Sequence, residues 1–531
     1  MRSPILVVFA IHFLGFPVTP YSRNSRQSGC LDVAIVGAGI GGTYTAWRLR
    51  DRGLKIGIFE NTDRIGGRMF SVFLPTASGV PIDLGAMRYE PENHKTLVGL
   101  LEELRLKSTV FKGDSFEKTY YFRGKHLKFA DLLTDNLPYN LRPGEPKDPD
   151  QLLWKLYQSA MNNTEPDKIS NVEEGITKDG IPLYKHGYLD LMGTLWSREA
   201  KQYLQDFIAF QSDFENNNAV HNTPADRLST GDVTTTIKTV TGGMNVISKR
   251  LGLLFLKASK QHSIRLNQRV ISIRRKTQRG KVWYELTIVS TRTVNGVTVD
   301  SKARQKKTCA KEVILACPRT ALSRIKWGPL RNDPVVLHAL DSVSDNSAMK
   351  LFLVYPSTWW DRLNGTSKSI VSDLPLRQTM EYGRYRNSLG HENVVVLVSY
   401  IDDETEIDYW TQLRKHPGTI SSSAVPAAYA VSRKVVEHAH HHLGKLYDVS
   451  PRDIPQPLDG VMQIWRGGAY GNAWELFKPG FKPSAVQVFM RRPSSIDRVF
   501  IVSNSFSMGL TFWSEGTLRE ADAVISQFSQ K

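Results

Sequence analysis

A short apolar run, Val33–Val36, leads directly into the glycine-rich segment Gly37-Ala-Gly-Ile-Gly-Gly42. A helix-compatible run from Thr43 to Leu49 follows the glycines. This order predicts a buried strand, a tight turn and a helix. In such a turn, Gly37 permits the bend, Gly39 lets the backbone approach a diphosphate, and Gly42 lets the helix pack closely on the strand. The diphosphate would lie at the positive end of the helix.

A second apolar run, Ile56–Phe59, ends in Glu60, whose carboxylate can accept hydrogen bonds from both hydroxyl groups of an adenosine ribose. The segment Arg64-Ile-Gly-Gly-Arg68 follows at once and contains Arg64, Gly67 and Arg68. Nicotinamide enzymes do not need this second loop, whereas flavin enzymes use it to wrap the diphosphate and the ring. The two segments together predict FAD as a non-covalently bound cofactor.

The other apolar runs that would complete a nucleotide-binding sheet are scattered along the chain. We therefore predict an α/β fold with mixed α+β insertions, in which a discontinuous Rossmann-like FAD-binding domain is assembled from distant segments. A sheet-based substrate domain and a helical insert would account for the rest. The expected segments are 30–87, 240–330 and 462–531 for the FAD-binding domain, 88–131 and 331–461 for the substrate domain, and 132–239 for the helical domain.

An apolar run of about a dozen residues, Ile5–Phe16, follows Arg2 near the N-terminus. This length fits the core of a signal peptide and is too short to cross a bilayer. We expect residues 1–20 to be removed and the mature protein to be secreted. Asn162 and Asn364 each begin an Asn-X-Thr sequon, so both are candidate glycosylation sites.

The chain has three cysteines. Cys309 and Cys317 would flank one buried strand and lie roughly 25 Å apart, which is beyond bridging distance. Cys30 precedes the first strand and could meet Cys309 at the same edge of the sheet. The expected disulfide is therefore Cys30–Cys309, and Cys317 is expected to be buried and reduced.

The net charge is +17, and it is unevenly distributed. Thirteen Lys or Arg residues lie between Arg265 and Lys311, against Glu285 and Asp300 alone. Alternating valines and threonines with turn-forming Arg279-Gly280 and Asn295-Gly296 predict a hairpin there. The charges would form either a solvated sheet face or a patch that attaches to anionic cell surfaces. No nucleic-acid-binding motif accompanies them, so we expect no nucleic-acid partner.

Four histidines, at 438 and 440–442, lie in one helix-compatible run. His438 and His442 would share a helical face, which is one feature of a metal site. No acidic or cysteine ligand completes such a site nearby, and flavin oxidation needs no metal. We expect a solvated helix end and no bound metal.

These motifs together resemble the flavin amine oxidase superfamily, in order from about Val33 to the C-terminus. The likeness is to its secreted L-amino-acid oxidases and to antibacterial gastropod glycoproteins. The gastropod proteins have a segment similar to Asn136-Leu-Pro-Tyr-Asn-Leu141. The resemblance implies conversion of an L-amino acid, O₂ and water to a 2-oxo acid, ammonia and hydrogen peroxide. It also implies a cytotoxic or antibacterial action through peroxide, and a homodimer is a further expectation.

The same resemblance assigns roles to residues. Asp83–Tyr89 looks like the segment that carries the arginine for the substrate carboxylate, here Arg88. Lys350 occupies the place of a catalytic lysine that holds a water against N5 of the flavin. Trp513–Leu518 resembles the helix entry that covers the flavin pyrimidine. Further cofactor contacts are implied for Gly85, Ala86, Met87, Arg88, Val270, Glu515, Gly516 and Thr517, and substrate walls for Trp465, Phe512 and Trp513.

The chain departs from the family pattern at two functional places. Ser503 and Ser505 stand where the family has a glycine and a carboxylate that holds the ribityl chain, and a neutral Ser505 would weaken that hold by about 1–2 kcal/mol. The substrate tyrosine of the family falls at either Glu381 or Tyr382. Because neighbouring strand residues point to opposite faces, only one of the two can face the pocket. If Glu381 does so, basic amino acids would be preferred.

Two alternative functions stay open at this point. The first is a polyamine or monoamine oxidase, against which Arg88 argues because it would repel a cation that lacks a carboxylate. The second is a catalytically weakened, surface-binding antibacterial protein on the same fold, which Ser505 and the high positive charge suggest.

Overall fold

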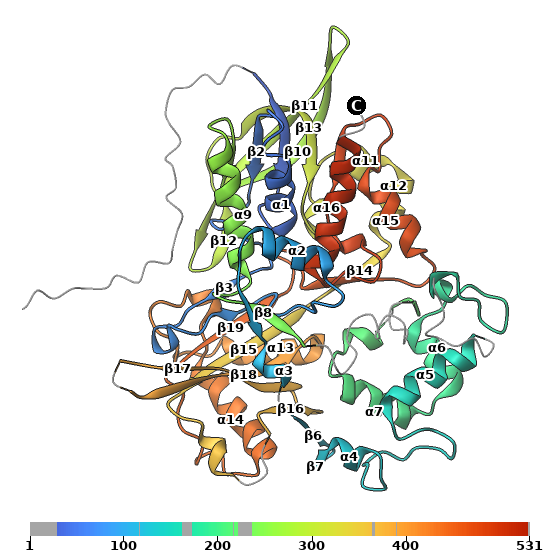
Figure 1. Ribbon diagram of the computed structural model, residues 1–531, viewed down its shortest axis with the longest axis vertical. Coiled ribbons are helices and arrows are strands. Elements are labelled where there is room, and N and C mark those ends of the chain that lie inside the picture. The colour runs from blue at the N-terminus through green and yellow to red at the C-terminus, as the bar shows by residue number, and fades with distance from the viewer. Residues whose placement is uncertain are drawn as a thin grey trace, which may run out of the picture.

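The computed structural model describes residues 29–528 except 116, 162–171, 216, 221–235, 364–366 and 389. Two large β-sheets lie one above the other, and a group of helices lies beside the lower sheet (Figure 1). This arrangement confirms the predicted α/β class with mixed α+β insertions. The expected signal peptide and both sequons, at Asn162 and Asn364, lie outside the described residues. Within the described ranges, no helix is long and apolar enough to cross a membrane.

The upper sheet contains the strand that precedes the glycine turn. Its strand order is β10-β11-β13-β1-β2-β9, with β12 joined to β11 and β21 joined to β13. Parallel pairing joins β1 to both β2 and β13, which gives the sheet the parallel centre of a Rossmann-like fold. The strands are β1 (Leu31–Val36), β2 (Ile56–Phe59), β9 (Ser263–Arg265), β10 (Gln268–Gln278), β11 (Lys281–Val294), β12 (Val297–Asp300), β13 (Lys306–Leu315) and β21 (Val499–Ile501).

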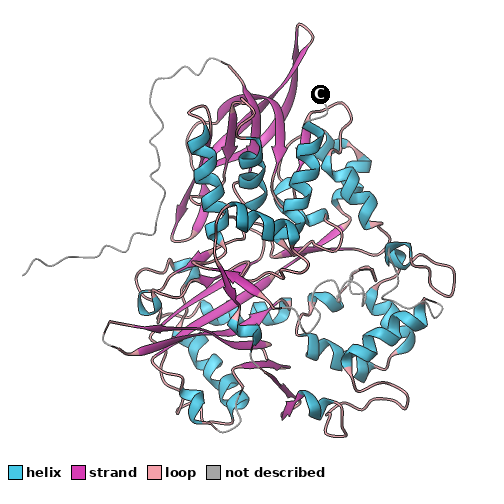
Figure 2. Ribbon diagram, in the orientation of Figure 1, coloured by secondary structure: helices cyan, strands magenta, loops and turns pink. Residues whose placement is uncertain are grey.

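Helices cover both faces of this sheet (Figure 2), which explains why β1 is apolar at almost every position. Alternate side chains of β1 belong to two separate apolar clusters, one on each face. The helices of the first cluster include α1 (Ile40–Leu49), α9 (Asn245–Ala258) and α16 (Ser514–Phe528), and those of the second include α12 (Pro334–Leu340) and α15 (Pro483–Arg491).

The lower sheet has the order β19-β15-β18-β17-β16-β6-β7. Only its β16–β6 pair is parallel. Its strands are β6 (Lys118–Phe122), β7 (Lys125–Lys128), β15 (Ala348–Tyr355), β16 (Ser369–Ser372), β17 (Gln378–Arg386), β18 (Glu392–Ile401) and β19 (Asp459–Trp465). The domain boundary expected at residue 462 falls inside β19. Because β19 pairs with β15 along its whole length, all of this strand belongs to the lower sheet. The other domain boundaries stay predictions.

The histidine run lies on α14 (Arg433–Tyr447), which packs with α13 (Glu404–Arg414) on the lower sheet. His440 is buried and hydrogen-bonded to the hydroxyl of Tyr355, at 3.1 Å. The ring nitrogens of His438 and His442 lie 2.6 and 3.3 Å from the hydroxyl of Tyr409. The expected solvated helix end is therefore wrong, because His438, His440 and His442 contact tyrosines of α13 and of the lower sheet.

The helical region beside the lower sheet has its own apolar core. It contains α5 (Pro149–Ala160), α6 (Tyr188–Leu195) and α7 (Arg198–Ile208). Asp148 caps α5 by accepting hydrogen bonds from two backbone N–H groups, and Ser197 caps α7 in the same way with one. These caps fix where the two helices begin.

A disulfide joins Cys30 to Cys309, the pair that the sequence favoured. The parallel register of β1 and β13 sets Leu31 opposite Ala310, and it therefore brings the two cysteines together with their Cα atoms 4.7 Å apart. Cys317 is free and half-buried. Burial raises the pKa of its thiol to about 12, so the thiol stays protonated at neutral pH.

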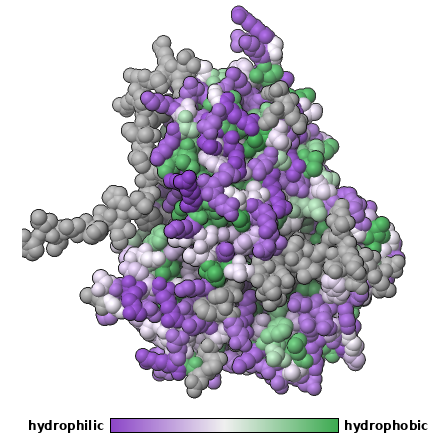
Figure 3. All heavy atoms as spheres, viewed as in Figure 1, coloured by the Kyte–Doolittle hydropathy of each residue, from purple (hydrophilic) through white to green (hydrophobic). Residues whose placement is uncertain are grey.

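The basic segment forms the predicted hairpin. Strands β10 and β11 turn at Arg279-Gly280, and β11 and β12 turn at Asn295-Gly296, with positive φ at all four residues. The β10–β11 hairpin projects from the top of the molecule (Figure 1), and its tip is strongly hydrophilic (Figure 3).

Candidate active site

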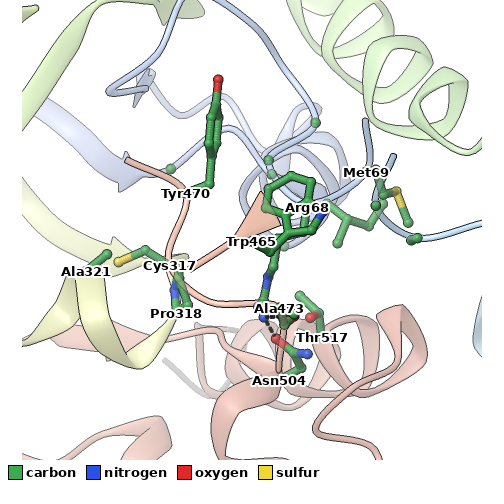
Figure 4. Close-up of a pocket in the computed structure, with 18 of the residues that line it drawn as sticks. Arg68, Met69, Cys317, Pro318, Ala321, Trp465, Tyr470, Ala473, Asn504 and Thr517 are labelled. Carbon is green, nitrogen blue, oxygen red and sulfur yellow. Dashed lines mark hydrogen bonds between the residues drawn. The ribbon is translucent and has the colours of Figure 1, made fainter. Parts of the chain in front are cut away.

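A cavity of about 360 Å³ is lined by residues from both sheets and from the helical region. This volume lies within the usual range of ligand pockets. The upper sheet contributes the glycine turn, the loop after β2 and the start of β10. The lower sheet contributes two residues of β15, one of β18 and the end of β19. Part of this wall, with Arg68, Trp465 and Tyr470, is seen in Figure 4.

Three glycines shape the turn between β1 and α1. Gly37 has φ +106°, and an added Cβ there would lie 2.3 Å from the carbonyl oxygen of Ala316. A Cβ at Gly42 would lie 1.9 Å from the carbonyl oxygen of Gly37, so only glycine allows α1 to approach so closely. Gly39 differs, because its Cβ would meet no protein atom closer than 4.0 Å. Gly37 and Gly39 line the cavity, whereas Gly42 serves the packing behind it.

The loop after β2 packs directly on this turn. The Gly66 N–H donates to the carbonyl oxygen of Ala38 at 2.9 Å, and Gly67 has φ +56°. Arg64 does not line the cavity; its guanidinium lies over the ring of Phe70, 3.9 Å from the centroid, and it stiffens the loop. Gly67, at the cavity, leaves its backbone open to a ligand.

Arg68 and Glu60 place opposite charges along the cavity. Arg68 donates hydrogen bonds to the carbonyl oxygen of Ala473 at 2.9 Å and to Oδ1 of Asn504 at 2.7 Å (Figure 4). Glu60 is buried at the end of β2, where its carboxylate accepts from the N–H groups of Ala38 and Thr62, at 2.7 and 2.9 Å. These bonds fix a carboxylate at the place where a ribose would need an acceptor.

The segment after β4 (Ile82–Asp83) contacts both the loop after β2, at Arg68, and β15, at Lys350. Gly85, Ala86, Met87 and Arg88 all line the cavity. A Cβ at Gly85 would lie 1.8 Å from the carbonyl oxygen of Arg68, so the two cavity-lining segments touch at this glycine.

Lys350 lies on β15 and is buried at the cavity wall. Its Nζ donates to the carbonyl oxygen of Gly85 at 2.6 Å and lies 4.7 Å from the centroid of the Tyr400 ring. Burial lowers the pKa of Lys350 to about 7; the carboxylate of Asp83 opposes this shift and the charge of Arg88 adds to it. Burial also raises the pKa of Asp83, to about 6. The ammonium group of Lys350 can therefore lose its proton near neutral pH.

The structure corrects the assignments at Glu381 and Tyr382, neither of which lines the cavity. Glu381 is buried and its two oxygens accept from Arg384, at 2.7 and 2.9 Å. The Tyr382 hydroxyl donates to Oδ2 of Asp83 at 3.3 Å, behind the cavity wall. A carboxylate already paired with Arg384 does not bind a basic substrate, so the expected preference for basic amino acids through Glu381 is withdrawn.

The structure also corrects the prediction that Ser505 contacts the cofactor. Ser505 is fully buried outside the cavity lining, and its hydroxyl accepts from the N–H of Arg319 at 3.1 Å. Ser503 and Asn504 line the cavity instead, and Asn504 holds Arg68. Ser505 lies in a 3-10 turn, Asn504–Phe506, that follows β21. The neutral groups at this place are thus the hydroxyl of Ser503 and the amide of Asn504.

Only part of the predicted helix entry reaches the cavity. Phe512, Trp513 and Thr517 line it, as do Val270 and Trp465 from other elements. Glu515 instead accepts from the N–H groups of Thr96 and Leu97, at 3.1 and 2.8 Å, and so caps α2 (Lys95–Glu103). Gly516 lies behind the wall, where a Cβ would be 2.5 Å from the carbonyl oxygen of Leu510. Neither contacts the cavity.

Several lining residues had no signal in the sequence. Near Lys350 and Arg88 the wall includes Tyr400 from β18 and Trp474 from β20 (Trp474–Phe477). The helical region adds two more residues, Phe210 and Asp213. They come from segments far apart in the chain and belong to no motif, so only the fold brings them together.

The fold and cavity are those of a nucleotide-dependent oxidoreductase, and the comparisons with known proteins give its family. The chain belongs to the family of flavin-containing amine oxidoreductases, whose model matches residues 40–524. It is 30% identical to aplysianin-A of Aplysia kurodai over 98% of this chain and 95% of that protein. It is 29% identical to achacin of Lissachatina fulica over 99% of each. An L-amino-acid oxidase of Bungarus fasciatus is 23% identical over 72% of this chain and 68% of its own.

Solved structures share the fold. Putrescine oxidase bound to putrescine matches with a TM-score of 0.65 and 19% identity, over 94% of this chain and 99% of that chain. Cyclohexylamine oxidase from Brevibacterium oxydans matches with a TM-score of 0.65 and 18% identity, over 94% and 100%. The expected resemblance to the flavin amine oxidase superfamily is thus confirmed, and membership implies a flavin cofactor.

The residues present fit a flavin dinucleotide. Gly39 leaves backbone open to the cavity at the N-terminal end of α1, and Gly67, which packs on Gly39, lines the same cavity. Glu60 and Arg68 supply an acceptor for a ribose and a cation beside a diphosphate. The indole N–H of Trp513, buried at the wall, has no hydrogen-bond partner within the described ranges. A donor of this kind matches the carbonyl and ring-nitrogen acceptors of an isoalloxazine.

Substitutions at two glycines separate cofactor binding from folding. Gly39→Ala adds a methyl group that meets no protein atom, at a φ of −70° that alanine readily adopts. Alanine is a poorer N-cap than glycine but restricts the unfolded chain, so the two effects offset and thermal stability without flavin should change by less than about 1 kcal/mol. We expect its FAD affinity to fall about tenfold or more, because the methyl occupies the cradle. Gly42→Ala should instead destabilise the apoprotein. Calorimetry and flavin titration measure both, and equal FAD affinity in Gly39→Ala and wild type would contradict this role.

Proposed function

We propose that this protein is a secreted, FAD-dependent L-amino-acid oxidase that converts an L-amino acid, O₂ and water to a 2-oxo acid, ammonia and hydrogen peroxide. The observation that carries the proposal is the presence of Arg88 and Lys350 at the wall of the same cavity as the glycine turn. A guanidinium suits the substrate carboxylate, and a buried amine that loses its proton near neutrality suits the substrate ammonium group.

In this proposal FAD is held non-covalently by the glycine turn, Glu60 and Arg68, and when bound it supplies the hydride acceptor that O₂ reoxidises. Arg88 binds the substrate carboxylate through two parallel hydrogen bonds and so fixes the position of Cα. Neutral Lys350 takes up a proton from the substrate ammonium group at Nζ, directly or through one water. The aromatic rings of Trp465 and Trp513 exclude bulk water.

The substrate class is the point on which the alternatives differ. An amine oxidase binds a cation without a carboxylate, and Arg88 beside Lys350 below pH about 7 would repel it. The alternative of a catalytically weakened, surface-binding protein assumed that flavin is held poorly where the family has a carboxylate. A polar side chain, Asn504, lines the cavity at this place and accepts a hydrogen bond from Arg68. These two observations favour the amino-acid oxidase.

A peroxide assay of the purified protein tests this function. The twenty L-amino acids are compared with putrescine and cyclohexylamine, the amines named in the two fold relatives. Peroxide from at least one amino acid and none from the amines is the expected result. Turnover of an amine alone would replace the proposal by an amine oxidase.

Loss of the guanidinium should abolish amino-acid oxidation without loss of flavin. For Arg88→Ala we expect kcat/KM to fall by about a hundredfold to several-thousandfold, since removal of one partner of a desolvated ion pair costs about 3–5 kcal/mol. The flavin content should match wild type. Steady-state peroxide production measures the change, and turnover equal to that of wild type would refute the carboxylate assignment.

The pH dependence of flavin reduction should depend on Lys350. Since burial lowers the pKa of Lys350 to about 7, the neutral amine is present above that pH and lost below it. The anaerobic rate should therefore rise between pH about 6 and 8 in wild type. Lys350→Met should reduce flavin more slowly and lose this rise. A stopped-flow profile with the same rise in both proteins would rule out Lys350.

We also propose that the protein attaches to anionic cell surfaces, where the peroxide would act against bacteria. The β10–β11 hairpin supports this, because its register places Arg274, Lys276 and Lys281 on one face beside Trp283, with Glu285 opposite Arg274 on the same face. All three cations are exposed and none forms an ion pair with any residue that the structure describes. A basic face with a tryptophan suits the interface of an anionic bilayer.

The hairpin surface has a matched control. Replacing Arg274, Lys276 and Lys281 by Gln should weaken binding to phosphatidylglycerol vesicles about a hundredfold, at about 1 kcal/mol per charge. The control replaces three exposed lysines of the helical region, Lys155, Lys178 and Lys185, by Gln. Equal vesicle binding by the two triple variants in a sedimentation assay would show that net charge, and not the hairpin, attracts the protein.

A further inference from the structure

The helical region reaches the cavity through one turn. This turn follows α7 and includes the 3-10 segment Ser212–Phe214. Phe210 and Asp213 of the turn line the cavity, and in the described residues they are its only contribution from the helical region. The position of the turn therefore determines part of the wall near Arg88 and Tyr400.

A single carboxylate holds this turn. Asp402, buried just after β18, accepts hydrogen bonds from the N–H groups of Gln211 and Ser212, at 2.7 and 2.9 Å. It also accepts from the Ser212 hydroxyl at 2.5 Å. Hydrogen bonds to a charged acceptor are about twice as strong as neutral ones. Because Tyr400 precedes Asp402 by two residues, the same short segment supplies both the anchor and part of the wall.

The anchored turn also organises aromatic rings. The Ser212 hydroxyl accepts from Nε1 of Trp474 at 3.2 Å. The Phe210 ring lies edge-on to Tyr400 and to Trp474, with centroids 5.3 and 6.2 Å apart. All three rings line the cavity. One carboxylate thus sets the relative position of three rings from three separate parts of the chain.

Two ion pairs of Arg377 also join the helical region to the lower sheet, and neither reaches the cavity. Arg377 donates to Oδ1 of Asp206 on α7 at 2.8 Å and to Glu406 on α13 at 3.2 Å. These bonds keep α7 docked on the lower sheet if Asp402 is altered. A change at Asp402 should therefore affect the turn and not the attachment of the whole helical region.

We infer that Asp402 is a positioning residue that sets the substrate end of the cavity, and that through Phe210, Tyr400 and Trp474 it determines which amino-acid side chains are accepted. The inference rests on the proposed oxidase function for its kinetic part. Its structural part, the immobilisation of Gln211 and Ser212, is independent of any activity.

The chain offers a matched control at Glu173. This carboxylate is as buried as Asp402 and likewise accepts from the N–H and hydroxyl of one serine, Ser484 on α15. It fixes the helical region to α15, and neither residue lines the cavity. Glu173→Gln therefore measures the effect on stability and activity of losing a buried carboxylate anchor that lies away from the cavity.

The test compares Asp402→Asn, Glu173→Gln and wild type as full-length holoproteins. In Asp402→Asn, hydrogen–deuterium exchange of Gln211 and Ser212 should accelerate about tenfold or more. KM for the best amino acid should rise about tenfold to a hundredfold with kcat within about threefold, because loss of the wall weakens ground-state binding. The preference among the twenty amino acids should flatten, and flavin content should not change.

Glu173→Gln should show none of these changes, and an equal rise of KM in both variants would overturn the inference, as would unaltered exchange of the turn in Asp402→Asn. Ser212→Ala, which keeps both backbone hydrogen bonds, provides a milder version with a rise of a fewfold in KM. It decides the question if Asp402→Asn does not fold. A wild-type protein that oxidises no amino acid would refute the proposed function, and the exchange measurement would still test the anchor.

Discussion

The close contact between α1 and the turn that precedes it is the constraint on which the site depends. Gly42 and Gly37 approach so closely that a single methyl group at residue 42 would overlap a carbonyl oxygen. This contact points the N-terminal end of α1 into the cavity and leaves Gly39 open beside it. The buried, apolar β1 and its helices on both faces provide the rigid frame that holds the turn.

The second half of the site exists because the two sheets meet at Gly85. Its backbone packs on the carbonyl of Arg68, and its own carbonyl accepts from Lys350. The indole N–H of Trp465 donates to the neighbouring carbonyl of Leu84 at 2.7 Å. One stretch of backbone thus joins the nucleotide-binding side of the cavity to Lys350. The contacts bury the Lys350 side chain, and this burial lowers its pKa.

The sequence predicted those features of the fold and site that are determined by residues close together in the chain. The strand, turn and helix around Gly37–Gly42, the strand that ends before Glu60 and the hairpins of the basic segment all follow from short patterns. Residues whose place depends on distant contacts were not predictable in this way. Glu381 pairs with Arg384, Glu515 caps another helix, and Ser505 lies in a 3-10 turn outside the cavity lining. Phe210, Tyr400 and Trp474 meet only in the folded chain.

We propose that this cavity holds FAD and that Arg88 and Lys350 bind an L-amino acid beside it. The most direct measurement is the absorption spectrum of the purified holoprotein during anaerobic addition of single L-amino acids, followed by air. We predict a flavin band that at least one L-amino acid bleaches, that its D-enantiomer does not, and that air restores with release of peroxide. A protein that binds no FAD on reconstitution, or a flavin band that none of the twenty amino acids bleaches, would contradict the account.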